Sequence, residues 1–326
     1  MTILPPPGPD FELELAHICE GAAVLFVDRT PLRPFSENQE APWYIDHLAW
    51  KTKFSSDEAT NWLYEIVSVY SAEAAHELRA VSRLLAEGTT TASIDLIVRG
   101  VLERAGKVMW LLDPKLHLGT STRAARAGLE VAISYGHYKE TLSYLGLEGE
   151  GRATVRANAS AHRALLKRWF DIDGPPDNPE DPKSGLTGDA QKWTLDGEPA
   201  ITYTASAVIA AERAGLTPEG GSGAYGGLSG FSHPSVIFSR EVRSIDENGI
   251  VEFVVRSDDL EKSVRTAVLS YLNAVDAAVI YYEANVESFR AYTDLLRRRI
   301  DEISVIAPSD DRAVSDEAST PPSLET

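Results

Sequence analysis

The chain is poor in cysteine and in cationic residues, and each shortage excludes a class of protein. Its 326 residues include one cysteine, Cys19, which excludes an intramolecular disulfide and a multi-cysteine metal site. There are 31 lysine and arginine residues against 49 aspartate and glutamate residues, which gives a formal net charge of -18. A field of this sign repels polyanions, so we expect no binding to DNA and no electrostatic binding to an anionic membrane.

Long apolar runs are also missing. The most apolar stretch, residues 264–282, contains Arg265, Asn273 and Asp276, which a membrane span of about 20 residues should not carry. Residues 1–10 contain prolines and lack the basic segment and apolar core of a signal peptide. We therefore expect a cytoplasmic protein without a membrane span, and 43% apolar residues are enough for a sizeable core.

Helical periodicity dominates residues 55–304 and predicts a single all-α domain, a multi-helix bundle. Two segments interrupt it. Residues 173–200 are rich in proline and glycine, which favours an exposed loop. Residues 236–256 carry strand-forming side chains on both sides of Asn248-Gly249, which predicts a β-hairpin. The helices before this hairpin are expected at residues 55–88, 93–112, 120–147, 152–170 and 202–215.

The two ends of the chain differ from this bundle. Residues 1–54 contain several prolines and predict an irregular arm, which Trp43, Tyr44 and Trp50 would anchor to the body by burial. Residues 305–326 are rich in serine, aspartate, proline and threonine and predict a disordered tail.

The last helix is predicted to be the longest, at residues 258–302. Its apolar residues alternate steps of three and four, and at 1.5 Å per residue it would extend over about 60 Å. Such a helix either spans the whole bundle or pairs with a second copy of the chain. We expect a homodimer formed through it.

Helix 93–112 has an apolar arc so wide that only a narrow polar stripe remains. Arg99 and Glu103 on this stripe are an i,i+4 ion pair, and a solvent-exposed face would explain them. Gly106 and Trp110 lie on the same stripe and indicate instead that another element packs there, which would bury the pair. Both interpretations remain open at this stage.

Residues 224–234 hold the densest group of polar residues and glycines. A short helix ending before Pro234 would place Tyr225, Ser229 and His233 on one face, at i, i+4 and i+8. His233 is then either a structural residue at a helix C-terminus or part of a site. The letters from Gly221 to Gly226 fit G-x-G-x-x-G, but a helix and not a strand precedes them, so we expect no dinucleotide site.

An Arg-x-x-x-Glu helix opposite a serine and histidine before a turn resembles the HEPN-like helical bundles. These modules occur in bacterial toxin, defence and nucleotide-associated systems, and the resemblance implies a helical bundle whose active members are metal-free ribonucleases using an arginine and a histidine. The family's motif is R-x(4–6)-H. No arginine precedes His233 at that spacing, whereas Arg156 and His162 fit it.

Three functions follow from these residues. The first is an intracellular binding or regulatory protein for an anionic ligand, a nucleotide or an RNA end. The alternatives are a HEPN-like ribonuclease, with His233 as acid-base group, Glu103 as its partner and Arg99 stabilising charge, and a non-catalytic dimeric scaffold. Since Glu73 and His76 form only one E-x-x-H motif, we expect neither a metal nor a cofactor. The residues expected to bind the ligand are Arg99, Trp110, Arg123, Arg126, Tyr225 and Ser229.

Overall fold

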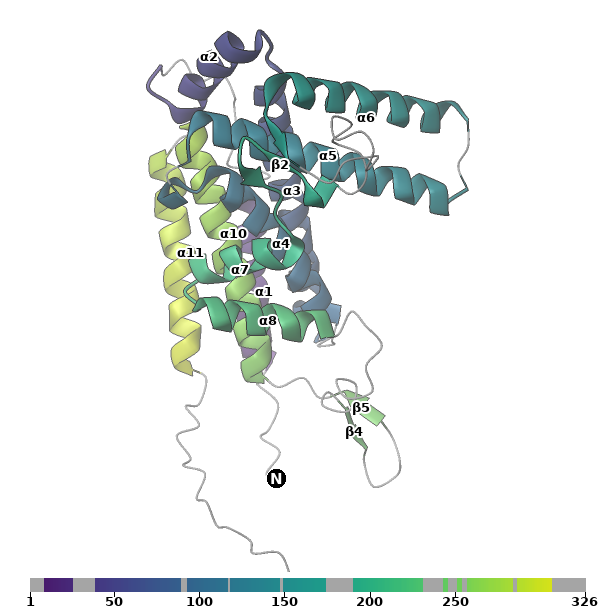
Figure 1. Cartoon of the computed structure of the whole chain (residues 1–326). Helices are drawn as coiled ribbons and strands as arrows, with labels where there is room; N and C mark the ends of the chain where they lie inside the picture. The colour runs from purple at the N-terminus through teal and green to yellow at the C-terminus, as the bar shows by residue number, and fades with distance from the viewer. Residues whose placement is uncertain are drawn as a thin grey trace, which may run out of the picture.

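The computed structural model describes residues 9–25, 39–88, 93–116, 118–146, 149–173, 190–230, 243–245, 251–253, 257–283 and 286–306. Over these residues the chain is an all-α multi-helix bundle with a small β-hairpin (Figure 1), as the periodicity predicts. None of the helices among them combines the length and the apolar character that a membrane span requires.

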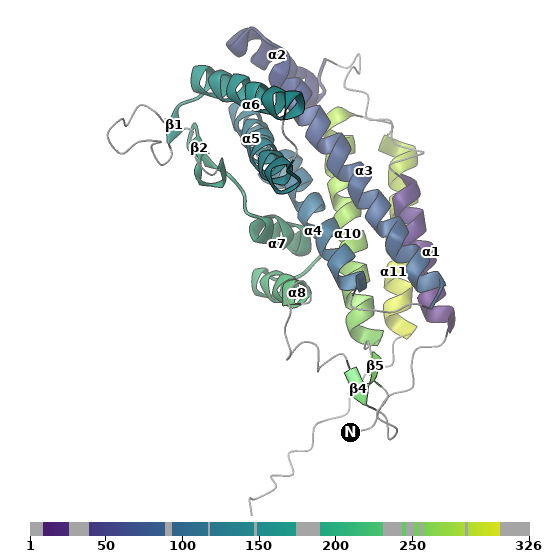
Figure 2. The same cartoon turned by 90° about the vertical axis from the view of Figure 1, so that its right-hand side faces the viewer.

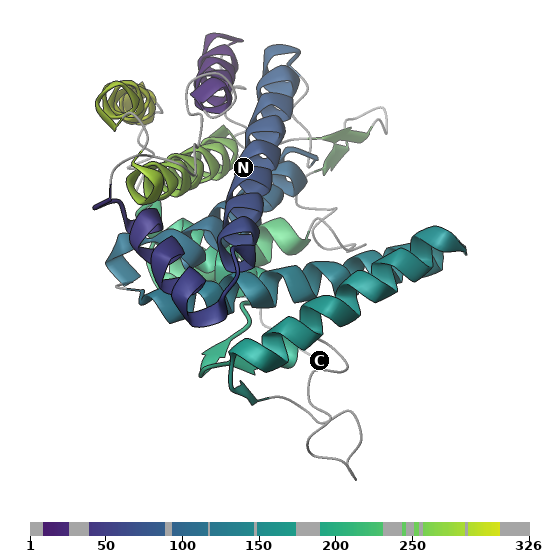
Figure 3. The ribbon, with the colours of Figure 1, turned by 90° about the horizontal axis from the view of Figure 1, so that it is seen from above.

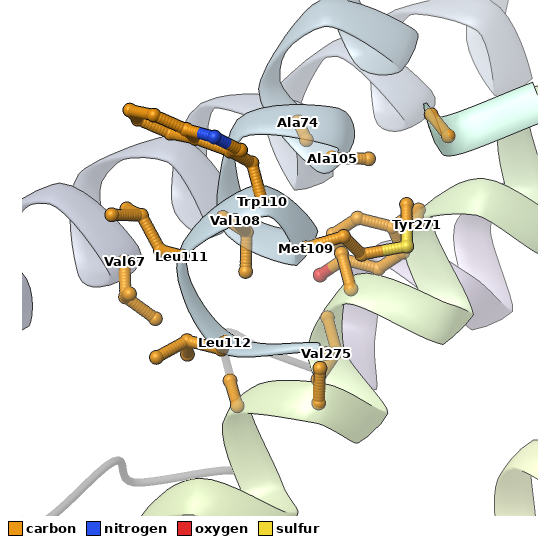
Figure 4. Close-up of a cluster of buried hydrophobic side chains, with 14 of the residues drawn as sticks. Val67, Ala74, Ala105, Val108, Met109, Trp110, Leu111, Leu112, Tyr271 and Val275 are labelled. Carbon is orange, nitrogen blue, oxygen red and sulfur yellow. The ribbon is translucent and has the colours of Figure 1, made fainter. Parts of the chain in front are cut away.

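Helix α4 (Ser93–Leu112) is the central element of the bundle. It packs against α3 (Glu58–Ala86) on one side and α10 (Ser257–Tyr282) on another, and α1 (Pro9–Val24) and α11 (Val286–Ile306) complete the core. Figure 4 shows Met109 of α4 beside Tyr271 and Val275 of α10, with Val67 and Ala74 of α3 in the same cluster. The wide apolar arc of the sequence therefore marks a helix buried on several sides, as predicted.

Helices α5 (Thr120–Tyr144) and α6 (Glu150–Trp169) form an antiparallel pair that projects from the bundle (Figures 1 and 3). We call this pair the α5–α6 arm. At its base, three two-residue strands form an antiparallel sheet in the order β1-β2-β3. The strands are β1 (Ile172–Asp173), β2 (Thr194–Leu195) and β3 (Glu198–Pro199), with one-turn 3-10 helices at η2 (Pro114–Leu116) and η3 (Ala190–Lys192).

Helices α7 (Tyr203–Arg213) and α8 (Pro218–Gly230) lie beside α4 (Figure 2). Thr202 begins α7 by accepting a hydrogen bond from the Ala205 amide. The two helices α4 and α7 approach closely at Gly106, where an added Cβ would lie 1.8 Å from the Ser206 carbonyl oxygen. Of the two interpretations that the sequence left open for the stripe of Gly106 and Trp110, the one in which another element packs there therefore holds at Gly106.

The prediction of an irregular arm at residues 1–54 is wrong where the structure describes them. They contain α1 and α2 (Pro42–Phe54). Pro42 does not break α2, because it stands at the start of the helix, where the missing backbone N–H costs nothing. Trp43 and Trp50 are buried, as expected of anchors. Ser55 ends α2 in a left-handed conformation (φ 53) and does not cap the next helix.

The single helix predicted at residues 258–302 is two helices, α10 and α11. Glu283 adopts a left-handed conformation (φ 46) after Tyr282, and the chain turns back. The Arg297 guanidinium donates to the Asn273 side chain over 2.9 Å, which fixes an antiparallel register. The near-heptad spacing is thus used within the chain, where both helices face one core. A homodimer stays a prediction.

The β-hairpin predicted at residues 236–256 is confirmed by β4 (Arg243–Ile245) and β5 (Val251–Phe253), which pair antiparallel with Ile245 opposite Val251. Of the loop predicted at residues 173–200, the end from residue 190 forms η3, β2 and β3. The rest of that loop, residues 174–189, and the tail from residue 307 lie outside the described residues.

Candidate functional site

The polar stripe of α4 meets α8 at Glu103. The Arg99 Nε–H donates to Glu103 Oε1 over 2.8 Å, and the Tyr225 hydroxyl donates to the same oxygen over 2.7 Å. The Arg99 guanidinium also lies over the Tyr225 ring, 5.2 Å from its centroid. One carboxylate therefore holds two side chains whose helices are far apart in sequence.

The Ser229 side chain belongs to the same group of residues, because it acts on Tyr225. Burial raises the pKa of Tyr225, and the hydrogen bond to Glu103 raises it further, whereas Arg99 and Ser229 lower it. The Tyr225 hydroxyl therefore stays protonated and donates to Glu103. Four of the residues singled out in the sequence, Arg99, Glu103, Tyr225 and Ser229, thus lie together, and we call them the α4–α8 cluster.

The α4–α8 cluster lies at the edge of the protein. Its burial is intermediate between the two interpretations that the sequence left open, a solvent-exposed ion pair and a buried one. The Arg99 side chain is 27% exposed and that of Glu103 is 17% exposed. The ion pair is therefore neither a surface pair nor fully buried. A group in solution can reach the guanidinium while its carboxylate partner remains held by Tyr225.

Arg104, the next cation on α4, bridges two carboxylates of α3. Its guanidinium lies 2.7 Å from Glu73 and 2.8 Å from Glu77. Burial raises the pKa of Glu77 to about 7, although Arg104 opposes the shift. Because Glu103 and Glu73 add to this increase, Glu77 is electrostatically coupled to the α4–α8 cluster.

A buried group of polar residues adjoins the cluster and was not predicted. The Lys107 ammonium and the Tyr70 hydroxyl both donate to Glu130 Oε1, and the Lys107 and Glu130 residues are only 4% and 1% exposed. The Tyr203 ring covers Lys107 at 4.6 Å, and its hydroxyl lies 3.1 Å from His137 Nδ1. Lys107 lies eight residues after Arg99 and four residues after Glu103 on α4, and this spacing was the available signal.

Arg123 belongs to a separate contact that ties α5 to α2. Two of its guanidinium nitrogens donate to Asp46, and the Tyr281 hydroxyl donates to the same carboxylate over 2.8 Å. The carboxylate is almost wholly buried. Breaking such a pair costs several kcal/mol, so we read Arg123 as a structural residue.

Arg126 also has internal partners. It donates to Glu198 over 3.0 and 2.9 Å, and to the Trp110 carbonyl oxygen over 2.6 Å, with its guanidinium 5.1 Å above the Trp110 ring. Trp110 lies eleven residues beyond Arg99 on α4, which is about 16 Å at 1.5 Å per residue. The structure therefore does not bring Arg126 and Trp110 to the α4–α8 cluster.

The two candidate histidines have different outcomes. His233 lies outside the described residues. His162 is buried, with Nε2 2.9 Å from the Gly128 carbonyl oxygen and its ring edge on Trp62. Burial lowers its pKa to about 4, with a smaller contribution from Arg163. At neutral pH His162 is thus uncharged, and its Nε2–H donates to the Gly128 carbonyl oxygen. Arg156, which precedes it at the R-x(4–6)-H spacing, is exposed.

The G-x-G-x-x-G letters are part of a helix. Gly221 begins them within α8, where an added Cβ would lie 3.1 Å from Ala211 of α7. Glycine thus permits close packing of α8 on α7, and α8 follows a helix rather than a strand.

A comparison of the chain with protein-family models, curated proteins and solved structures found no significant match. The resemblance to HEPN-like bundles therefore stays a prediction that rests on the residues quoted for it.

Proposed function

We propose that the protein is a binding or regulatory module that holds the anionic group of a ligand, a nucleotide or a phosphorylated RNA end, at the α4–α8 cluster. The observation that carries the proposal is the shared carboxylate of Glu103, which fixes both Arg99 and Tyr225 at a solvent-accessible edge.

Preorganisation is the physical reason. A free arginine side chain loses conformational entropy when it is ordered by a ligand, about 0.5–1.5 kcal/mol. Arg99 is already oriented by Glu103 and by the Tyr225 ring, so a bound anion does not have to order it. A guanidinium is also the group best suited to grip a phosphate or carboxylate through paired N–H donors.

The local charge decides what kind of anion fits. In and around the α4–α8 cluster three cations face four carboxylates, and burial raises the pKa of Glu77 to about 7, so this group carries only part of a negative charge at neutral pH. The net charge of this region is therefore small, and directed hydrogen bonds, rather than long-range attraction, must supply the affinity. This favours one anionic group over a polyanion. The charged residues counted are Arg99, Arg104, Lys107, Glu73, Glu77, Glu103 and Glu130.

A thermal-shift titration with AMP, ADP, ATP and 5′-phosphorylated dinucleotides tests the proposal. Binding to the folded state alone stabilises it by about 2.7 kcal/mol at a ligand concentration of 100 Kd. We expect at least one of these ligands to raise the melting temperature of the wild type, and the increase to be smaller in Arg99→Ala. The matched control is Arg83→Ala, an exposed arginine of α3, which should keep the full shift. No shift with any of the ligands, or an unchanged shift in Arg99→Ala, would remove the support for a site at Arg99.

The ribonuclease hypothesis is the alternative proposal. The partly exposed guanidinium of Arg99 supports it, because such a group can stabilise negative charge developing on a reacting phosphate. Its acid-base group would be His233. Cleavage of single-stranded RNA in EDTA by the wild type, lost in His233→Ala, is the result that this alternative predicts. Equal cleavage by both proteins would contradict it.

The scaffold hypothesis has its own prediction. If the cluster only fixes how α4 and α8 pack, Arg99→Ala lowers the melting temperature, and the loss is the same with and without nucleotide. A loss that grows with nucleotide concentration supports binding instead.

A further inference from the structure

A second group of cations lies on the α5–α6 arm, away from the α4–α8 cluster. We propose that the groove between α5 and α6 binds the phosphate group of a phosphorylated ligand. The cations that line it are Lys139 of α5 and Arg156 and Arg163 of α6. The remaining lining residues are Val155, Ala159 and Ser160.

The charge of this groove is opposite to that of the chain. Its lining has three cations and no carboxylate. Helix α6 as a whole carries five cations against Glu150, a net charge of +4 over 20 residues, in a chain of net charge -18. The five cations are Arg152, Arg156, Arg163, Lys167 and Arg168.

Screening allows this local charge to act despite the acidic bundle. At physiological ionic strength the Debye length is about 8 Å, so charges farther away are largely screened. Helix α6 is about 30 Å long at 1.5 Å per residue, and the arm projects from the bundle (Figure 3). Most acidic residues of the bundle are therefore too distant to cancel the field in the groove. On the arm itself, Glu140 follows Lys139 on α5, and Glu150 begins α6.

The helical spacing places the donors around one space. Arg156, Ser160 and Arg163 recur at i, i+4 and i+7, on one face of α6, and Lys139 faces them from α5. The Arg163 Nε–H donates to the Ala159 carbonyl oxygen over 3.3 Å, which holds that guanidinium along the wall of the groove. His162 adds no charge at neutral pH, since its pKa is lowered to about 4 by burial and by Arg163. The three cations therefore account for the positive charge.

The size of the groove limits the ligand. Its volume is about 250 Å³. Pockets that enclose a whole drug-sized molecule hold about 300–1,000 Å³. The groove is slightly smaller than such a pocket, and it is large enough to accommodate a phosphate group. Two sources offer this chemistry, a small phosphorylated compound and the phosphodiester backbone of a nucleic-acid strand.

Isothermal titration calorimetry tests the site with two probes, pyrophosphate and a ten-nucleotide uridine strand, at 0.05 and 0.15 M NaCl. The variant is Arg156→Gln/Arg163→Gln. Its control is Arg83→Gln/Arg298→Gln, two exposed arginines of α3 and α11, which changes the net charge equally. We expect the groove variant to bind at least one probe tenfold or more weakly than the wild type, and the control to bind within twofold.

The two probes distinguish the two possible sources of the phosphate group, a small compound and a nucleic-acid strand. Binding of pyrophosphate alone assigns a small phosphorylated ligand, whereas binding of the strand with a steep salt dependence assigns a backbone phosphate. Absence of binding by both probes overturns the proposal, and so does an equal loss in the control, which would show an effect of net charge. Lys139→Gln, on α5, should also weaken binding. This result would show that the loss in the α6 variant does not come from a local defect in that helix. Repeating the titrations in the Arg99→Ala background removes any binding of the probes at the α4–α8 cluster, so this proposal can fail or hold independently of that cluster.

Discussion

At the scale of single residues, Glu103 organises the candidate site, because it accepts hydrogen bonds from both Arg99 and Tyr225. Arg99 and Glu103 both lie on α4, and Tyr225 joins them from α8. The complete cluster therefore depends on a contact between α4 and α8, which double-mutant cycles can measure.

Tyr225→Phe should destabilise the protein by about 1.5–3 kcal/mol, the range for a hydrogen bond to a charged group. The effect should fall to about 0.5–1.5 kcal/mol in a Glu103→Gln background, since a neutral acceptor replaces the charged one. Urea denaturation of the four proteins of the cycle measures this coupling. Tyr144→Phe serves as control, because Tyr144 is 90% exposed and should show no effect. Additive effects of the two changes would show that the hydrogen bond does not form.

Glu77 should make stability depend on pH. Its pKa is raised from 4.5 to about 7 by burial, so between these values the folded state binds a proton that the unfolded state releases. This contribution to stability is complete below pH 4.5 and is lost as the pH rises through about 7. The melting temperature of Glu77→Gln, relative to that of the wild type, should therefore increase as the pH rises from 5 to 8. Glu65→Gln, an exposed residue of the same helix, should not. A constant difference for Glu77→Gln across this range would contradict the assignment.

The sequence could predict the cluster because its members lie at helical spacing on two short stretches. Arg99 and Glu103 are four residues apart on α4, and Tyr225 and Ser229 are four apart on α8. Glu130 could not be found in this way, since its partners come from three other helices and only the tertiary structure brings them together.

At the scale of helices, the contact between α4 and α7 requires a glycine at position 106. An alanine Cβ there would lie 1.8 Å from a backbone oxygen of α7, which cannot move without moving that helix. Gly106→Ala should destabilise the protein by about 1–3 kcal/mol or more, as overpacking does. Gly136→Ala on α5 has no neighbour within 4 Å and should instead stabilise by up to about 1 kcal/mol. Thermal denaturation of both variants measures the difference. Equal effects would mean that α4 and α7 are farther apart.

Helix boundaries were predicted well at α4 and α7, and poorly at α2 and after Tyr282. Helix α4 was predicted with its observed bounds, and Thr202 marked the start of α7. The break after Tyr282 was missed because the apolar spacing continues across it, and no proline or glycine interrupts the pattern. At Pro42 a proline was read as a breaker although it begins a helix.

At the scale of the whole molecule, the net charge of -18 opposes compaction through self-repulsion. Added salt should therefore raise the melting temperature between 0.02 and 0.5 M NaCl at pH 7.5. Exposed ion pairs such as Lys51 with Asp57 contribute too little to reverse this trend. Thermal denaturation at several salt concentrations measures the slope. A falling melting temperature would show that attractive surface pairs outweigh the repulsion.

The central claim is that the α4–α8 cluster binds an anionic group, and calorimetric titration with AMP tests it most directly. Because the groove of the α5–α6 arm could also take a phosphate, the titration is best made in the Arg156→Gln/Arg163→Gln background. We predict one site per chain in that background, and no measurable binding once Arg99→Ala is added. Binding that persists without Arg99, or its absence while Arg99 and Glu103 are intact, would contradict the claim for this nucleotide site.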